Sequence, residues 1–152
     1  LVDDALREVS PERIVIDDNA DLDSVVEVPR SAFVVALVGL MKNALYAGGK
    51  ETPVHVRAGA LDGGLVLDIH DRGPRVAGEV LERIGEPFFT TKPLGSGMGL
   101  GVFLARSMAE RMGGALEFIV DETGTTVRVS LPHADHQPMT NQERDVALVV
   151  AA

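Results

Sequence analysis

The order of strand and helix patterns along the chain constrains its fold more than any other feature. Hydrophobic residues recur with the period of a strand or of a helix in eight segments: strands at 13–17, 54–58, 65–71, 116–120 and 125–131, and helices at 32–47, 77–84 and 102–112. Neighbouring strands joined by short glycine turns form hairpins, and the regular alternation of a parallel doubly wound sheet is absent. We therefore predict a two-layer α/β sandwich, with helices packed on one face of a mixed, mostly antiparallel sheet.

A glycine-rich run, Gly95-Ser-Gly-Met-Gly-Leu-Gly101, leads directly into the amphipathic helix pattern at 102–112. The apolar stripe of this helix is predicted to be Leu100, Phe103, Leu104, Met108 and Met112. Glycines let the main chain approach an anion closely, and the free N–H groups and positive dipole end of the following helix attract it. Such a cluster also occurs in plain flexible loops, so its neighbours in space decide its meaning. The residues that we expect to hold phosphate here are Gly95, Gly97, Gly99, Leu100 and Gly101.

Charge and composition limit the partners. The 152 residues have a net charge of −9 and a pI near 4.8, so we expect no nucleic-acid binding and no general attraction to anionic membranes. There is no cysteine, no secretory signal and no apolar run long enough to span a bilayer. We expect a cytoplasmic domain that does not itself enter the membrane. Because the chain opens on Leu1, we also expect it to be part of a longer protein.

Two strands place polar side chains on their apolar faces. In the strand at 65–71, Asp71 shares a face with three aliphatic residues, because strand side chains alternate. A buried carboxylate needs a donor, and the exocyclic amino group of adenine is one candidate. Thr125 similarly faces inward on its own strand and could bond to Asp71 or to a bridging water. The alternatives are a strand-ending turn aspartate and a core threonine satisfied by backbone.

Asn43 and Lys92 are the remaining polar candidates. The amide oxygen of Asn43, on the first long helix, is a neutral ligand suited to Mg²⁺. Lys92 lies in the glycine- and proline-rich segment 85–101, which we call the lid because loops of this length are commonly functional covers. Its ammonium group is a point charge suited to phosphate. Taken singly, each is more often an ordinary solvated side chain.

Taken together, four stretches resemble the ATP-binding catalytic domain of sensor histidine kinases, which belongs to the GHKL superfamily with the Bergerat fold, alongside gyrase and Hsp90. The resemblance spans about 13–132, with all four boxes in order. Its N-box, G1, phenylalanine and G2 boxes are similar to Leu37-Val-Gly-Leu-Met-Lys-Asn-Ala44, Asp71-Arg-Gly-Pro74, Gly85-Glu-Pro-Phe-Phe-Thr-Thr-Lys92 and Gly97-Met-Gly-Leu-Gly101. Details of the lid and G2 box look nearest to RegB/PrrB-type redox-responsive sensors.

The resemblance implies a role for each residue. Asn43 would be the magnesium ligand and, with Lys92, would serve catalysis. Asp71 and Gly73 would contact adenine, and the G2 glycines would hold the triphosphate of ATP. Two positions depart from the pattern: Gly39 stands where a second asparagine is common, and Arg75 stands where a second glycine is usual. Tyr46 also takes a place where a phosphate-facing lysine or arginine is often seen.

The implied activity is transfer of the ATP γ-phosphoryl group to a histidine on a separate dimerisation domain, in the same full-length protein or in trans, and then to an aspartate of a response regulator. The four histidines of this chain do not resemble the family's phosphoacceptor box, so we expect the acceptor to lie elsewhere: they are His55, His70, His133 and His136. We expect residues 1–12 to be a linker or the end of a preceding helical domain, 13–132 to be the ATP-binding domain and 133–152 to be a C-terminal tail of unknown role. The apolar stretch 146–150 of that tail could be an added strand, a docking segment or the edge of another domain. The full-length parent could be anchored in the inner membrane.

Three other functions remain open at this point. A degenerate module could dock a helical dimer or a response regulator without using ATP, which Gly39 and Arg75 would favour. An anti-sigma-type serine kinase would share the nucleotide site but phosphorylate a serine. A gyrase-like hydrolase is disfavoured, because its general-base glutamate would occupy the place of Gly39.

Overall fold

The structure is a computed structural model and describes residues 2–17, 25–61, 64–93, 97–132 and 146–150. Three predicted features therefore lie outside the described residues: Gly95 of the glycine run, and the tail histidines His133 and His136. Within the described part of the chain, no helix has the length and hydropathy of a membrane span.

A five-stranded sheet forms one layer, with the strand order β1-β3-β4-β6-β5. Only the edge strand β1 runs parallel to its neighbour β3, and the other three pairings are antiparallel. The predicted mixed, mostly antiparallel sheet is thus confirmed. The strands are β1 (Ile14–Asp17), β3 (Val54–Leu61), β4 (Gly64–Asp71), β5 (Ala115–Val120) and β6 (Thr125–Leu131).

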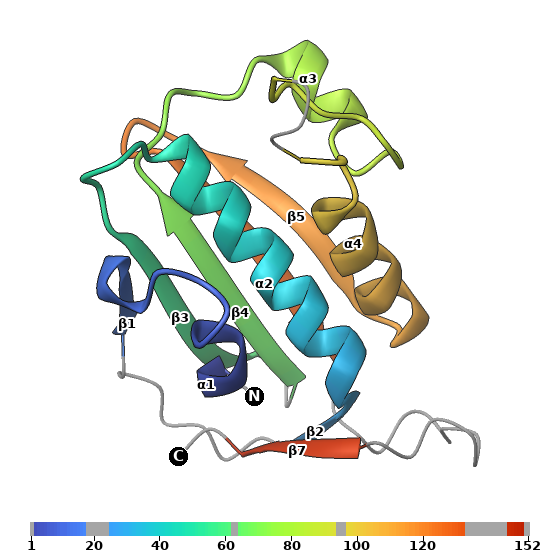
Figure 1. The fold of residues 1–152 in the computed structure, drawn as a ribbon. Coiled ribbons are helices and arrows are strands. Elements are labelled where there is room, and N and C mark those ends of the chain that lie inside the picture. The colour runs from blue at the N-terminus through green and yellow to red at the C-terminus, as the bar shows by residue number, and fades with distance from the viewer. Residues whose placement is uncertain (1, 18–24, 62–63, 94–96, 133–145, 151–152) are drawn as a thin grey trace.

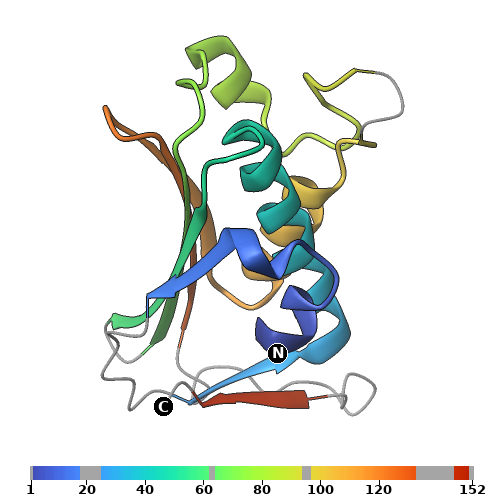
Figure 2. The same ribbon diagram turned by 60° about the vertical axis from the view of Figure 1, so that its left-hand side comes forward.

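Helices form the second layer. The long helix α2 (Arg30–Ala47) and the helix α4 (Gly101–Arg111) lie across one face of the sheet, whereas no helix of the described chain covers the opposite face (Figures 1 and 2). Short segments α1 (Val2–Leu6), η1 (Pro11–Arg13) and α3 (Gly78–Arg83) complete the set. The predicted two-layer sandwich is confirmed. The first long helix begins slightly earlier than predicted, with Pro29 at its N-cap.

A separate two-stranded ribbon was anticipated only in part, because a strand at 146–150 was one of the alternatives but its pairing partner was not predicted. Strand β2 (Val25–Pro29) pairs antiparallel with β7 (Val146–Val150), so that Val25 faces Val150 and Pro29 faces Val146. This ribbon lies at the end of the molecule from which α2 starts (Figure 1). The two strands are far apart in sequence, and each is short, so neither has a hairpin signal that would identify it.

The core fills the space between the sheet and the helices. Its largest fully buried side chains include Leu37, Leu40 and Met41 from α2, and Val54, Val56 and Ile69 from the sheet. The hydrophobic spacing of 32–47 therefore predicted the buried side of α2 correctly.

The predicted buried side of α4 was partly right: Met108 is buried and Met112 packs against the core, but Leu104 is not in the core. Leu104, placed in the apolar stripe by its size, is 41% exposed, while Val102, Ala105 and Ala109 are buried. The reason is a close crossing of the two helices: a Cβ added at Gly39 on α2 would lie 2.9 Å from the Cα of Gly101. Only small residues fit such a crossing, so the larger leucine is displaced to the outside.

Candidate functional site

Asp71 ends β4 on the helix-covered side of the sheet. It is only 5% exposed, as the strand alternation predicted, and it lies opposite Thr125 of β6 in the strand register. Its Oδ1 accepts a hydrogen bond of 2.8 Å from the N–H of Gly73. Burial raises the pKa of Asp71, while the Gly73 hydrogen bond and the nearby His70 act in the opposite direction. The second carboxylate oxygen is the one available to a ligand donor.

The turn after Asp71 packs against the C-terminal end of α2. A Cβ added at Gly73 would lie 2.6 Å from the carbonyl oxygen of Ala47 and 2.7 Å from Asp71 Oδ1. Those distances are shorter than any real side chain tolerates, so glycine is required here by close backbone approach. The structure thereby brings the G1 turn beside the helix that carries Asn43.

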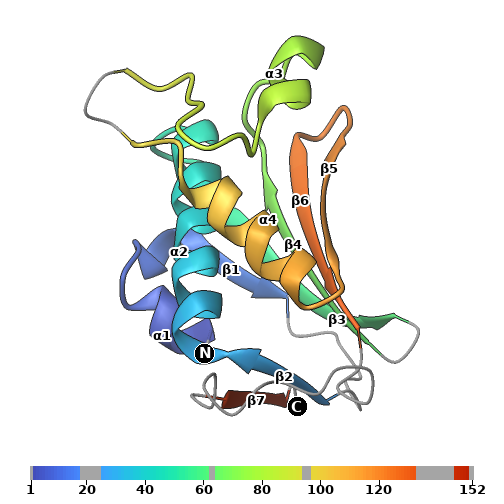
Figure 3. The ribbon, with the colours of Figure 1, turned by 90° about the vertical axis from the view of Figure 1, so that its right-hand side faces the viewer.

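Asn43 and Lys92 come together although they are far apart in sequence. The ammonium group of Lys92 donates a hydrogen bond of 2.6 Å to Asn43 Oδ1. Both residues are half-buried, and burial lowers the pKa of Lys92. The lid passes near the C-terminal end of α2 on its way from α3 to α4 (Figure 3). The Lys92 ammonium and the Asn43 amide oxygen thus form one small polar region beside the apolar core.

In the G2 run, the conformation and close packing of the backbone explain why positions 99 and 101 are glycines. Gly99 has a φ of +68°, and a Cβ there would lie 2.8 Å from the carbonyl carbon of Phe88. Gly101 begins α4 against Gly39, and Leu100 is the N-cap residue of that helix. Gly97 is exposed. The free N–H groups at the start of α4 therefore follow directly from the glycine run, as an anion site requires.

Thr125 is buried as predicted but makes no direct hydrogen bond to Asp71, which was one of its two expected partners. It is 4% exposed, and within the described residues its Oγ1 has no hydrogen-bond partner. The register places it opposite Asp71, but no hydrogen bond joins the two side chains in the described structure. A buried hydroxyl without a partner needs water or a ligand to satisfy it.

The two departures from the family pattern have different surroundings. Gly39 lies at the crossing with Gly101, where any side chain would push the two helices apart. Arg75 is exposed in the segment between β4 and α3, and Gly78 beyond it begins α3. The absence of a side chain at position 39 therefore has a packing reason that the sequence did not reveal.

Tyr46 was noted in the sequence only for lacking a positive charge. In the structure the Lys92 ammonium lies 4.6 Å from the centre of the Tyr46 ring, within the range of a cation–π interaction. Asn43 and Tyr46 are three residues apart on α2 and share one side of the helix. Helical spacing could have placed these two together, but no local signal could have brought Lys92 to them.

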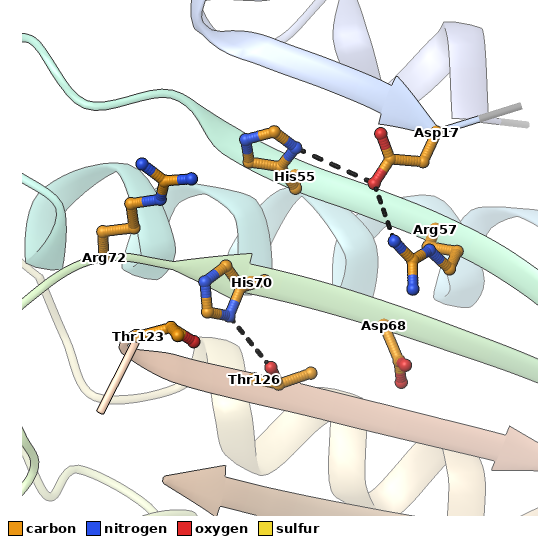
Figure 4. Close-up of a pocket in the computed structure, with 8 residues that line it drawn as sticks. All are labelled: Asp17, His55, Arg57, Asp68, His70, Arg72, Thr123 and Thr126. Carbon is orange, nitrogen blue, oxygen red and sulfur yellow. Dashed lines mark hydrogen bonds and ion pairs between the residues drawn. The ribbon is translucent and has the colours of Figure 1, made fainter. Parts of the chain in front are cut away.

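A polar pocket on the opposite, uncovered face of the sheet was also missed (Figure 4). It encloses about 300 Å³ and holds both strand histidines: its lining is Asp17, His55, Arg57, Asp68, His70, Arg72, Thr123 and Thr126. His70 Nδ1 lies 3.0 Å from Thr126 Oγ1, and Arg57 pairs with Asp17 at 3.3 Å. None of the predicted nucleotide residues lines it. The sequence did contain a signal for this pocket: His55 and Arg57 are two residues apart on one strand, as are Asp68 and His70 on the next, so each pair shares one strand face.

Comparison with known proteins agrees with this geometry. Residues 30–135 match the family model described as "Histidine kinase-, DNA gyrase B-, and HSP90-like ATPase". The C4-dicarboxylate transport sensor protein DctB of Rhizobium meliloti (strain 1021) is 35% identical over 100 residues, which make up 64% of this chain and 16% of that protein. The chain thus spans only a small part of the length of this relative.

Solved structures show the same fold. A mycobacterial sensor histidine kinase, MprB, superposes with a TM-score of 0.72 at 26% identity, covering 91% of this chain and 93% of that one. The catalytic domain of the histidine kinase ThkA gives a TM-score of 0.70 at 25% identity, covering 87% and 85%. The nearer resemblance to RegB/PrrB-type sensors stays a prediction. The chain belongs to the family of histidine kinase-, DNA gyrase B- and HSP90-like ATPases, as the ATP-binding catalytic domain of a two-component sensor kinase.

Proposed function

We propose that this domain transfers the γ-phosphoryl group of ATP, with Mg²⁺ as cofactor, to a histidine on a separate helical dimerisation domain. The observation that carries the proposal is the meeting of three predicted elements at the C-terminal end of α2. There the Asp71–Gly73 turn packs on Ala47, and Lys92 of the lid bonds to Asn43. The full-length protein would then pass the phosphoryl group to an aspartate of a response regulator, at the cytoplasmic side of a membrane if its parent is anchored there.

Each residue has a distinct task in this proposal. The free Asp71 oxygen would accept a hydrogen bond from the adenine amino group, and the buried Thr125 hydroxyl, which lacks a partner among the described residues, would complete the same wall. The Lys92 ammonium and the N–H groups at the start of α4 would neutralise phosphate oxygens. Phosphoryl transfer needs little covalent help from a protein, so positioning and charge neutralisation would supply most of the rate.

The residues present fit a magnesium ion. Asn43 Oδ1 is a hard oxygen already directed at a cation, the Lys92 ammonium. Within the described residues there is no cluster of three or more His, Asp or Glu that would form an all-protein metal cage. That arrangement suits Mg²⁺, which takes one or two protein oxygens and completes its shell with phosphate and water. Asn43 would hold the ion there, and Mg²⁺ would supply charge neutralisation for the phosphates.

The packing of Gly39 weighs against a degenerate, non-catalytic module. The absence of a side chain at Gly39 was the main reason to suspect lost chemistry, yet the helix crossing with Gly101 accounts for it. Arg75 is exposed, so it has room to turn away from the nucleotide. Both observations support an intact ATP site, which an interaction module would not need.

An equilibrium titration with ATP tests the proposal. We expect the unmodified chain to bind ATP more tightly with Mg²⁺ than with a chelator, and Asp71→Asn to bind about 10- to 100-fold more weakly, because a hydrogen bond to a charged acceptor is lost. Asp68→Asn, a carboxylate of the uncovered face, is the matched control and should retain full affinity. No binding by the unmodified chain would reject the proposal, and equal affinity of the Asp71 variant would remove Asp71 from the adenine role.

A phosphotransfer assay tests the acceptor. With radiolabelled ATP we expect no stable label on this chain alone and an acid-labile label on the dimerisation domain of the full-length protein when it is added. An acid-stable label on a serine would instead favour the anti-sigma-type serine kinase. The two outcomes differ chemically, since phosphohistidine hydrolyses in acid and phosphoserine does not.

A further inference from the structure

Lys92 is held at several points, and one of them is an aromatic face. Its backbone N–H donates to Thr90 Oγ1 at 3.1 Å, and its ammonium group donates to Asn43 Oδ1 at 2.6 Å. The same ammonium lies 4.6 Å from the ring centre of Tyr46. A Cβ added at Gly97 would lie 3.4 Å from Lys92 Cδ, so the lysine stem runs beside the glycine-rich part of the lid.

Fixing a lysine side chain in one position costs conformational entropy, which other contacts must offset. Its four-carbon stem has several rotatable bonds, and its ammonium group is strongly hydrated, so a free lysine at a loop samples many positions. Thr90 fixes only the main chain, and Asn43 supplies a single oxygen. Tyr46 is the contact that restrains the ammonium from the side, because a cation lying over the ring face is attracted by the ring's negative potential.

The exposure of Tyr46 fits a role other than packing. Its side chain is 52% exposed although it lies at the end of the most buried helix. Val35 on the same helix is similarly exposed, at 53%, and has no such partner recorded in the described structure. A half-exposed aromatic ring contributes little to the core, but it offers an open face to the lid.

We propose that Tyr46 is a positioning residue that holds the lid cation Lys92 at the phosphate end of the nucleotide site. The inference rests on the proposed function, because it assumes that Lys92 meets the phosphates of ATP. The Lys92–Asn43 hydrogen bond must open when Asn43 turns to another cation. The Tyr46 ring then keeps the ammonium beside α2 instead of releasing it to water. Tyr46 thereby determines the affinity for phosphate without touching phosphate itself.

Ligands with and without phosphate test this role. We would titrate ATP with Mg²⁺, and adenosine, into the unmodified chain and the variants Tyr46→Leu, Tyr46→Phe and Lys92→Met. Tyr46→Leu should weaken ATP binding about three- to tenfold, because the cation–π contact is lost, and should leave adenosine binding unchanged. Tyr46→Phe keeps the ring and should bind ATP within about twofold of the unmodified chain. Val35→Ala, at equal exposure on the same helix, should have no effect.

Two further readouts separate positioning from a general structural effect. In a double-mutant cycle, adding Tyr46→Leu to Lys92→Met should weaken ATP binding no further, because the residue that the ring positions is already gone. In the free protein, the NMR signal of the Lys92 ε-methylene should show an upfield ring-current shift that Tyr46→Phe keeps and Tyr46→Leu abolishes. This second readout needs no nucleotide.

The outcomes distinguish the two proposals. If the unmodified chain binds neither ATP nor adenosine, the proposed function fails. If it binds ATP and Tyr46→Leu binds equally well, the positioning role is wrong while the function stands. Loss of adenosine binding in Tyr46→Leu, or additive losses in the double variant, would also overturn the inference, because either result assigns Tyr46 an action independent of Lys92.

Discussion

The two faces of strand β4 show how one short segment serves two environments. On the covered face, Ile69 and Asp71 are buried against α2, and the carboxylate is held by the N–H of Gly73. On the uncovered face, Asp68 accepts two hydrogen bonds of 2.7 Å from Arg128, and His70 lies by Thr126. The carboxylate of Asp68 thus finds its partner in the next strand. Among the described residues, the hydrogen bond recorded for Asp71 comes from its own turn, which leaves the carboxylate capacity for a ligand donor.

The largest expected difference between the faces is in packing. Ile69→Ala should lower the free energy of unfolding by about 3 to 4 kcal/mol, since a fully buried side chain leaves a cavity. His70→Ala, the next residue on the open face, should cost less than about 1 kcal/mol. Urea denaturation of both variants measures the contrast. Equal losses would mean that the uncovered face is itself covered in solution.

Next in size is the helix crossing above the covered face. Gly39→Ala should cost about 1 to 2 kcal/mol, because its Cβ would meet the Cα of Gly101 at 2.9 Å and this strain exceeds the gain in helix propensity. Gly59 of β3 is the control, since a Cβ there meets nothing within 4 Å. Gly59→Ala should change stability by less than about 0.5 kcal/mol. A stabilising Gly39→Ala would show that the helices are farther apart than described.

A smaller effect is expected for the ion pair on the uncovered face. Asp68→Asn should cost about 0.5 to 1 kcal/mol, less at high salt, because the cross-strand pair with Arg128 is partly exposed. Arg57→Gln breaks a longer pair with Asp17, in which the arginine side chain is 66% exposed, and should cost still less. Thermal melts at low and high salt compare the two. A loss that is independent of salt would rule out an electrostatic origin.

The smallest expected effect is a dependence on pH that differs in sign between two aspartates. Burial raises the pKa of Asp71, so its stabilising contribution is present below its unfolded-state pKa and is lost as the pH rises through the folded pKa. Stability of Asp71→Asn relative to the unmodified chain should therefore increase across that window. Urea denaturation from about pH 3 to about pH 8 follows it.

Asp121, in the exposed turn before β6, is the opposite case. Hydrogen bonds from the Thr123 hydroxyl and N–H lower the pKa of Asp121, so its contribution is present above its unfolded-state pKa and is lost as the pH falls. Asp121→Asn should therefore lose stability relative to the unmodified chain as the pH rises. The same sign for both variants would contradict the assigned causes.

Much of the fold and part of the site could be predicted because their signals are local. Helical spacing identified the buried side of α2, and strand alternation placed Asp71 and Thr125 inward. Where local size and tertiary packing disagreed, the prediction failed: Leu104 looked like a core residue, but the close helix crossing selected Ala105 instead. The pairing of the β2–β7 ribbon was missed because it joins distant segments.

By itself, the sequence determined the two-layer architecture and the inward side of β4, because the periodicity of helices and strands acts over a few residues. Only the tertiary structure decided that Lys92 bonds to Asn43 beside Tyr46, that Thr125 is left without Asp71 as a partner, and that Gly39 meets Gly101. The physical reason is that these contacts depend on how the lid, sheet and helices approach one another, and such distances follow from the packing of the whole core.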